Sequence, residues 1–506
     1  MTNPEQMTAP APARAPRSGP GRPAWLASPK VLRTEVLAGL VVALALIPEA
    51  ISFSIIAGVD PRVGLFASFT MAVSIAFLGG RPAMISAATG AVALVVAPLV
   101  RERGLDYLVA TVILAGALQI VLGLLGVARL MRFVPRSVMV GFVNALAILI
   151  FTAQLPYLRD VPWVVYVMVA VGIAIMVFLP KLTTVVPAPL VAIVLLTAAV
   201  VVSGLVVPDV GDQGELPDSL PALFFPDVPL TYETLQIIAP YALGVALVGL
   251  MESLMTAKLV DDITDTRSHK TREAWGQGAA NVITGFFGGM GGCAMIGQTM
   301  INVRSGARTR LSTFLAGTFL LILVVGLGDV VAIIPMAALV AVMIMVSVGT
   351  FDWHSVRPAT LRRMPRSETA VMVVTVAVVV ATHNLAIGVV VGVLVAALLF
   401  ARRVAHLVQV EGTLEQDGAV RRYRVTGALF FASSNDLVYQ FDYAEDPDEV
   451  VIDLSDAHVW DASTVAALDA ITTKYAAKGK HAEIVGLNEA SAERYERLAG
   501  HLGGGH

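Results

Sequence analysis

The sequence has few charged residues and almost no cysteine. Only 14% of its 506 residues are charged and 56% are hydrophobic, whereas a typical soluble domain carries about 25% charged residues. The single cysteine, Cys293, excludes an intramolecular disulfide and a cysteine-based metal cage. The net charge of −3 gives no reason to expect a nucleic-acid partner. With a mean hydropathy of +0.77, the composition is that of an integral membrane protein.

Hydrophobic runs begin at Val36, after a stretch rich in Pro, Ala and Arg that we expect to be a disordered tail. A span takes about 20 apolar residues, and the runs predict two sets of seven spans. The first set is 36–57, 62–78, 84–100, 108–126, 137–155, 161–179 and 187–206. The second set is 236–257, 274–290, 296–306, 309–327, 330–348, 368–383 and 385–401.

The predicted parts of the chain follow from these runs. They are a tail (1–28), a first membrane repeat (29–207), an acidic extracytoplasmic loop (208–234), a second membrane repeat (235–403) and a C-terminal domain (404–500). Lys and Arg are enriched in cytoplasmic loops, and the acidic loop contains neither. We therefore predict a multi-pass protein of the inner (plasma) membrane with both termini in the cytoplasm.

Two sets with an odd number of spans have opposite orientations, which is the inverted-repeat plan of secondary transporters. The third segment of each set supports a repeat, since Ala-Met-Ile follows a glycine pair in both. The first segment has Gly79-Gly80 and then Ala83-Met84-Ile85, and the second has Gly291-Gly292 and then Ala294-Met295-Ile296. Chance could also produce this match.

These two segments are short and broken by Gly and Pro, which is typical of a transporter's binding site. An extended stretch leading into a half-helix leaves backbone N–H groups free, and the positive helix N-terminus then favours an anion. Two such ends that meet near the bilayer centre would form one anion site. Alternatively, the glycines only allow close helix packing. Cys293 borders this region and is expected to be a small packing residue.

Glu49 and Glu252 lie within predicted spans, where ionisable residues are candidates for function. Phe53 lies one turn beyond Glu49 on the same helix face. Because burial favours a neutral carboxyl, Glu49 could carry a proton with the substrate, or it could stay protonated and bonded to backbone. Glu252 is its counterpart in the second set. It is close to Lys258 and Asp261, so a structural ion pair or cap is the alternative for it.

The C-terminal domain alternates strand-like and helix-like patterns, which predicts an α/β unit. Residues 450–454 and 482–487 are expected to be strands, and 462–477 a helix. Asp461 precedes that helix and is expected to cap it. Ser463 is a candidate regulatory phosphosite, although we prefer the capping interpretation of this segment.

Several motifs, in their order along the chain, resemble the sulfate permease (SulP) family of anion transporters. They are Ala38-Gly39-Leu40, Ile47-Pro48-Glu49-Ala50, Arg132-Phe133-Val134-Pro135, Val140-Gly141-Phe142, Gly278-Ala279-Ala280-Asn281, Phe286-Phe287-Gly288-Gly289 and Ser305-Gly306-Ala307-Arg308-Thr309. The C-terminal segment, with Val451-Ile452-Asp453-Leu454 and Asp461, is similar to a STAS domain.

The resemblance implies a polytopic helical fold of fourteen spans, a seven-plus-seven inverted repeat divided into core and gate domains, and a homodimer. It places the anion between half-helices that begin near Ser86 and Gln298. The implied substrate-binding residues are Glu49, Phe53, Ile85, Ser86, Ala87, Ile296, Gly297 and Gln298. Members of the family carry sulfate, chloride, bicarbonate or dicarboxylates by proton symport, sodium symport, exchange or uncoupled pathways.

This sequence departs from the family pattern, because many members have Gln where Glu49 stands and Arg where Gln298 stands. The site gains an acid and loses a fixed cation, so a free anion would meet a carboxylate unless Glu49 is protonated. In the STAS-like segment, Ala462 and Val465 replace the Ser and Gly of related signalling proteins, which speaks against phosphorylation at Ser463.

We therefore predict a secondary active transporter that takes up a small inorganic or carboxylate anion by proton symport and alternating access. Glu49 and Glu252 are its predicted proton-coupling residues. The alternative is an anion channel or a membrane sensor that signals through the STAS-like domain. No catalytic motif supports an enzyme, and no cofactor or metal is expected. The predicted partners are a small anion, a proton, the lipid bilayer and a second copy of the chain, with no nucleic acid.

Overall fold

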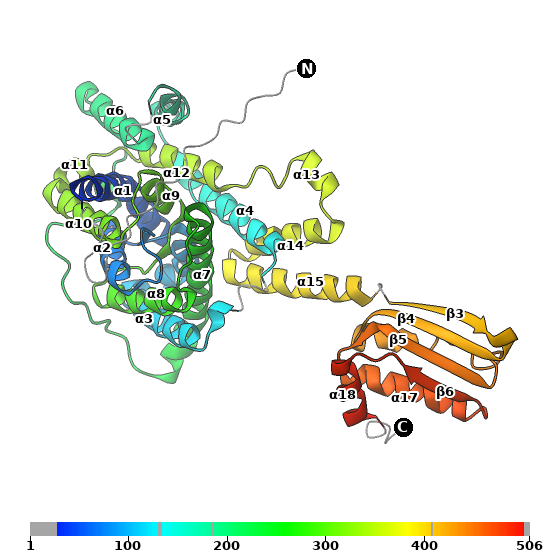
Figure 1. Cartoon of the computed structure of the whole chain (residues 1–506). Coiled ribbons are helices and arrows are strands. Elements are labelled where there is room, and N and C mark those ends of the chain that lie inside the picture. The colour runs from blue at the N-terminus through cyan, green and yellow to red at the C-terminus, as the bar shows by residue number, and fades with distance from the viewer. Residues whose placement is uncertain (1–27, 130–133, 184–186, 406–407, 500–506) are drawn as a thin grey trace, which may run out of the picture. The chain divides into compact units, whose positions relative to one another are not determined.

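The computed structural model describes residues 28–129, 134–183, 187–405 and 408–499. The predicted tail, 1–28, therefore lies almost wholly outside the described residues, as do Arg132 and Phe133 of one motif. The chain forms two compact units, one up to Val393 and one from Leu394 (Figure 1).

The first unit is built from helices. In the first half of the chain they are α1 (Pro29–Ala57), α2 (Pro61–Leu78), α3 (Gly90–Leu124), α4 (Arg136–Thr152), α5 (Trp163–Leu182) and α6 (Ala188–Ser203). In the second half they are α7 (Tyr232–Thr264), α8 (Lys270–Phe286), α9 (Ile296–Arg304), α10 (Arg310–Gly326), α12 (Met336–Thr350) and α14 (Arg366–Thr382), with short α11 (Gly328–Ala332) and α13 (Pro358–Arg363) between them. The last helix, α15 (Leu385–Ala405), begins in this unit and ends in the second.

A helix occupies each predicted span, and α3 covers two of them. Gly104, at φ 80° and ψ −166°, breaks α3 between these two parts, because only glycine adopts such a conformation without strain. Among the described residues, seven helical segments are long and apolar enough to cross a membrane: α1, α2, α3, α4 together with the helical turn after it (Arg136–Leu158), α5, α7 and α15. The count of fourteen spans stays a prediction.

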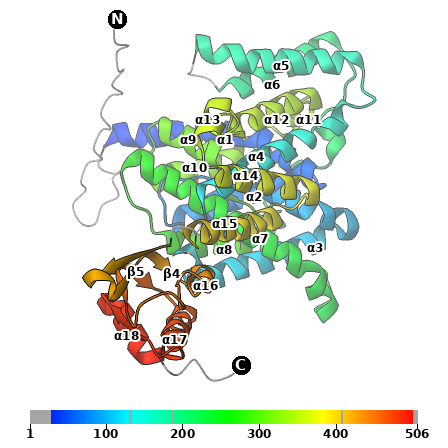
Figure 2. The ribbon, with the colours of Figure 1, turned by 90° about the vertical axis from the view of Figure 1, so that its right-hand side faces the viewer.

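Contacts between helices form two groups. In one group α3 packs on α7 and α8, while α10 packs on α1 and α2. In the other group α12 packs on α4 and α5, α14 packs on α4, and α6 packs beside α5 (Figures 1 and 2). The groups meet where α1 contacts α12 and where α3 contacts α4. The anion site predicted from the sequence belongs to the first group.

Each of the two broken segments contains a short strand. β1 (Ser86–Ala87) pairs antiparallel with β2 (Cys293–Ala294), Ser86 opposite Ala294 and Ala87 opposite Cys293. Each strand leads into a helix, α3 after β1 and α9 after β2. One strand and one helix start thus come from each half of the chain.

Two details of the sequence analysis are wrong. The helix expected near Ser86 begins at Gly90, because the chain up to Thr89 is extended and bonded to β2. The repeated Ala-Met-Ile does not mark equivalent positions either. Residues 83–85 precede β1, whereas 294–296 include the end of β2 and the first residue of α9. The match therefore carries no support for the repeat.

The second unit contains a four-stranded sheet in the order β3 (Gln409–Glu415), β4 (Val420–Leu429), β5 (Glu449–Val459), β6 (His481–Val485). β3 is antiparallel to β4, and the other neighbours are parallel. α17 (Ala462–Ala476) and α18 (Glu489–Leu498) pack together on one face of the sheet, and α16 (Phe431–Leu437) packs on α17 (Figure 2). The strand, helix and strand predicted at 450–454, 462–477 and 482–487 are confirmed.

Candidate functional site

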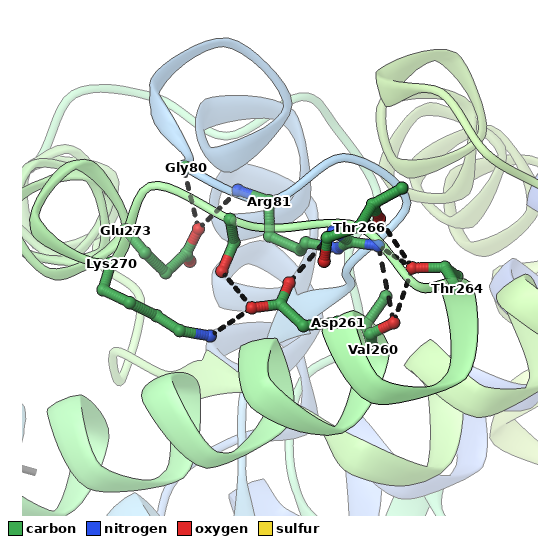
Figure 3. Close-up of polar contacts among 9 residues, drawn as sticks. Gly80, Arg81, Val260, Asp261, Thr264, Thr266, Lys270 and Glu273 are labelled. Atoms are coloured by element: carbon green, nitrogen blue, oxygen red, sulfur yellow. Dashed lines mark hydrogen bonds and ion pairs between the residues drawn. The ribbon is translucent and has the colours of Figure 1, made fainter. Parts of the chain in front are cut away.

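The extended segment between α2 and α3 is anchored by Arg81, whose side chain is buried. Its guanidinium donates to Asp261 Oδ1 at 3.0 Å and to Thr266 Oγ1 at 2.8 Å, and it also contacts the Thr264 hydroxyl (Figure 3). Lys270 Nζ donates to the other oxygen of Asp261 at 2.8 Å. The loop from the first half is thereby fixed to the end of α7 and the start of α8.

Glu273 holds the backbone of the same loop. Its fully buried carboxylate accepts from the amides of Gly80 at 2.7 Å and Arg81 at 3.0 Å (Figure 3). Gln277, one turn along α8, donates to Glu273 at 2.9 Å and to Ser86 Oγ at 2.6 Å. This polar chain leads from the loop to β1 and sets where β1 meets β2.

Ile85, Ser86 and Ala87 have no exposed surface. The Ile85 carbonyl accepts from the amide of Met295 at 2.9 Å, and its amide donates to Thr299 Oγ1 at 3.0 Å. These residues position the strand pair behind the helix starts, and the structure does not bring them to the cavity described below.

Two helix N-termini follow the strand pair. Thr89 caps α3, with Oγ1 accepting from the amide of Val92 at 3.4 Å, and α9 follows Met295 without a side-chain cap. The first N–H groups of a helix have no partner within that helix. Among the described residues, the amides of Gly90, Ala91 and Gly297 have no hydrogen-bond acceptor. Both ends therefore offer free donors and positive helix dipoles.

These N-termini border a cavity of about 430 Å³. Residues from both helix groups line it, on α1, α3, α4, α7, α9 and α12. The lining consists of Glu49, Phe53, Thr89, Gly90, Ala91, Phe142, Val143, Leu146, Ile150, Glu252, Met255, Met295, Ile296, Gly297, Gln298, Val346, Gly349 and Thr350. A cavity between the groups is where a ligand would respond to movement of one group against the other.

The charged groups of this lining are two carboxyls. It contains no Lys, Arg or His among its described residues. Glu49, which is only partly buried, has the Gln298 side chain as its hydrogen-bonding partner. Glu252 is 9% exposed and accepts from the Cys293 thiol at 2.9 Å. The two acids are thus held by neutral partners, and no fixed cation in the lining neutralises them.

The structure brings together most of the predicted site. Glu49, Phe53, Glu252, Ile296, Gly297 and Gln298 all line the cavity, whereas Ile85, Ser86 and Ala87 lie behind it. Glu252 accepts from the Cys293 thiol and forms no ion pair among the described residues, and nearby Asp261 pairs with Arg81 and Lys270.

Sequence reasoning missed Thr89, Gly90 and the apolar residues from α4 and α12. A threonine before an apolar helical run is an N-cap signal that could have identified Thr89. The α4 and α12 residues carry no comparable signal, because apolar residues line most of every span.

Asp461 caps α17 as predicted, accepting from the amide of Thr464 at 3.0 Å. Its other carboxylate oxygen accepts from the amide of Phe431 at 2.6 Å. Ser463 lies in the first turn of α17 and is exposed. The capping interpretation is confirmed, and a modification at Ser463 stays a hypothesis.

A helical membrane unit with two half-helix N-termini facing a central cavity defines the class of multi-pass membrane transporters. The model of the sulfate permease family matches residues 32–163 and 157–375, and that of the STAS domain matches 413–500. The chain belongs to the sulfate permease family, a family of anion transporters and not of enzymes, and it carries a STAS domain.

Relatives agree over nearly the whole chain. YbaR of Bacillus subtilis, a sulfate transporter by name, is 54% identical over 92% of this chain and 97% of its own length. The bicarbonate transporter BicA of Picosynechococcus is 26% identical over 92% of this chain and 91% of its own.

Two solved structures share the fold. The transmembrane domain of a cyanobacterial BicA aligns with a TM-score of 0.63 at 26% identity, covering 73% of this chain and 98% of that domain. Murine Slc26a9, an anion transporter in the inward-facing state, aligns with a TM-score of 0.81 at 16% identity, covering 94% of this chain and 89% of its own.

Proposed function

We propose that this protein takes up a small inorganic or carboxylate anion together with protons, as a secondary active transporter that works by alternating access. The observation that carries this proposal is a cavity with two helix N-termini and two carboxyls, whose described lining has no basic side chain.

The argument for protons is electrostatic. Free amides and helix N-termini attract an anion to the cavity. An ionised Glu49 or Glu252 would repel that anion strongly, because charges interact more strongly in a partly desolvated site than in water. Protonation removes the repulsion without a fixed cation. The anion and the proton therefore favour each other's binding, which is the thermodynamic condition for symport.

The names of relatives suggest which anions to test. YbaR is named for sulfate and BicA for bicarbonate. The cavity volume of about 430 Å³ accommodates either ion, and small mono- and dicarboxylates as well. Glu49, Phe53, Ile296, Gly297 and Gln298 are the proposed substrate contacts, while Ile85, Ser86 and Ala87 hold the strand pair behind them.

The remaining proposals concern architecture. The helix group containing α1, α3, α7 and α9 acts as the core domain, and the group containing α4 and α12 acts as the gate domain. Rocking one group against the other exposes the cavity to each side in turn. The chain has fourteen spans in an inverted repeat. Its parts are the first repeat (29–207), the extracytoplasmic loop (208–234), the second repeat (235–403) and the STAS domain (404–500). It lies in the inner membrane as a homodimer with both termini in the cytoplasm.

The test is uptake of labelled sulfate, bicarbonate and small carboxylates into proteoliposomes, with and without an inward proton gradient. We expect the gradient to drive accumulation in the wild type. In Glu49→Gln and Glu252→Gln, accumulation should be lost while exchange of the same anion across the membrane persists. Binding without accumulation under any gradient would contradict transport and favour the sensor; gradient-insensitive, purely downhill flux would favour the channel.

A further inference from the structure

A row of hydrogen bonds connects Glu252 to the N-terminus of α3. The Cys293 thiol donates to Glu252 Oε2 at 2.9 Å, and its sulfur lies 3.2 Å from the Thr89 hydroxyl. Thr89 Oγ1 also accepts from the amide of Val92. Glu252 and Thr89 line the cavity, whereas Cys293 is fully buried and does not. A residue outside the described lining thus joins two residues within it.

We propose that Cys293 is a positioning residue which makes the Thr89 hydroxyl a hydrogen-bond donor to the anion only while Glu252 is protonated. The inference rests on the proposed function, since it requires an anion and a proton in the cavity together. It adds a mechanism by which protonation of Glu252, on one side of the cavity, controls the hydrogen bond from Thr89 to the anion on the other side.

The route follows from how many protons each group carries. A thiol and a hydroxyl each donate one hydrogen bond, whereas an ionised carboxylate only accepts. While Glu252 is ionised, the thiol proton points to the carboxylate and the sulfur is left to accept from Thr89. The Thr89 proton is then directed at the sulfur and is not available to a ligand.

Protonation of Glu252 reverses the direction of the two hydrogen bonds that Cys293 makes. The new carboxyl O–H donates to the sulfur, and the thiol proton turns to Thr89 Oγ1, which has a second lone pair beside the one used by Val92. The Thr89 proton is then free to turn into the cavity. The added proton comes from water and stays on Glu252, while the thiol and hydroxyl protons only rotate.

Glu252, Cys293 and Thr89 are buried, and a hydrogen bond left unmade away from water is costly. The hydrogen bonds between the three side chains therefore change direction together. The titratable groups facing Glu252 are the Cys293 thiol from β2 and, across the cavity, Glu49 from α1. Charged residues of the neighbouring helices lie elsewhere along them: Arg101, Glu102, Arg103 and Asp106 beside the break in α3, Lys270, Arg272 and Glu273 in the first turn of α8, and Arg304 at the end of α9.

The first test is spectroscopic and independent of transport. Cys293 is the only cysteine of the sequence, so the infrared S–H stretching band of the full chain in lipid vesicles reports this thiol alone. We expect the band to shift as pH rises, as the thiol proton changes its acceptor from Thr89 to an ionised carboxylate. In Glu252→Gln the band should be independent of pH. A band that is insensitive to pH in the wild type, or that shifts equally in Glu252→Gln, overturns the inference.

The second test measures the pH profile of KM for sulfate, or for bicarbonate if sulfate is not carried, in proteoliposomes. Loss of one hydrogen bond to the anion should raise KM at acidic pH about tenfold. We expect this rise in Thr89→Val, with little change at alkaline pH and no change in kcat. In Cys293→Ala no sulfur accepts the Thr89 proton, so the donor is free at every pH; KM should fall about tenfold at alkaline pH and stay unchanged at acidic pH. Cys293→Ser and Thr89→Ser keep one donor and one acceptor and should retain the wild-type profile.

A wild-type pH profile in Cys293→Ala would overturn the inference. A purely structural role would instead alter kcat and KM at every pH, and would not be rescued by the conservative variants. If the wild type shows no proton-stimulated uptake although its S–H band responds to pH through Glu252, the proposed function fails and the hydrogen-bond reversal stands.

Discussion

Gln298, in the first turn of α9, is the partner of Glu49 on α1, and together they replace a fixed positive charge with a group whose charge depends on pH. An amide can bond to a carboxyl in either protonation state, because it both donates and accepts. The pair therefore tolerates the change in charge that proton coupling requires. An arginine in the same place would hold Glu49 ionised.

Gln298→Arg should flatten the dependence of transport on protons. The guanidinium supplies a permanent cation for the anion and an ion pair for Glu49, so sulfate or bicarbonate uptake should persist at alkaline pH and lose its stimulation by an inward proton gradient. The measurement is initial uptake rate against pH with and without the gradient. Gln298→Met is the uncharged control, and equal profiles for the two variants would contradict the electrostatic argument.

The sequence was sufficient to predict the two acidic residues of the site, but not the side chains to which they form hydrogen bonds. Glu49 and Glu252 were identified because ionisable residues are rare within apolar spans. The bond from Cys293 to Glu252 joins residues 41 positions apart, and it depends on how β2 lies against α7. Spacing along the chain contains no information on that packing.

The N-termini of helices α3 and α9 differ in how closely other residues pack against them. A Cβ on Gly90 would lie 2.8 Å from the ring of Phe53 and 3.2 Å from Ile150. A Cβ on Gly297 would meet nothing within 4 Å. The N-terminus of α3 thus requires glycine for close packing against α1, whereas that of α9 is open.

Gly90→Ala should therefore destabilise the protein by about 1–3 kcal/mol, the usual cost of overpacking, because Phe53 must leave its position. Gly297→Ala is the matched control and should unfold at the wild-type temperature. Thermal unfolding of both variants in the same detergent tests this difference. Identical midpoints for the wild type and Gly90→Ala would show that the ring moves without cost.

In the STAS domain, Asp461 bonds both to the start of α17 and to the start of α16. Asp461→Ala should weaken the cap by about 1 kcal/mol and make the amides of the first turn of α17 exchange about fivefold faster. Hydrogen exchange of peptides from the full chain measures this. Ser463→Ala, at an exposed position in the same turn, should leave exchange unchanged, and equal effects of the two variants would argue against capping.

Helix positions were predictable because spans are long apolar runs, but the start of α3 was not. The residues from Ala83 to Thr89 are small or apolar enough to continue a helix. Met84 to Thr89 are extended because their backbone bonds to β2 and to Thr299 of α9, whereas Ala83 has a φ of 61° and its carbonyl accepts from Asn302. A tertiary partner overrides local propensity here, and the partner is more than 200 residues away.

For the molecule as a whole, the distribution of Lys and Arg predicts which loops face the cytoplasm. In a Cys293→Ser background, a cysteine introduced at exposed Ser219 of the acidic loop should react with a membrane-impermeant maleimide on intact cells. A cysteine at exposed Ser463 should react only after permeabilisation. Labelling of both positions on intact cells, or of neither, would contradict the proposed orientation.

The pairing of β1 with β2 has a consequence for biogenesis. When the first half of the chain has been inserted, Ser86 and Ala87 have no strand partner and buried Arg81 lacks Asp261, because these partners have not yet been synthesised. Unpaired backbone and an unpaired cation are poorly tolerated within a bilayer. The nascent first half must therefore keep this segment near water or protein until α7, α8 and β2 arrive, and the halves produced as separate polypeptides should assemble only when they are made together.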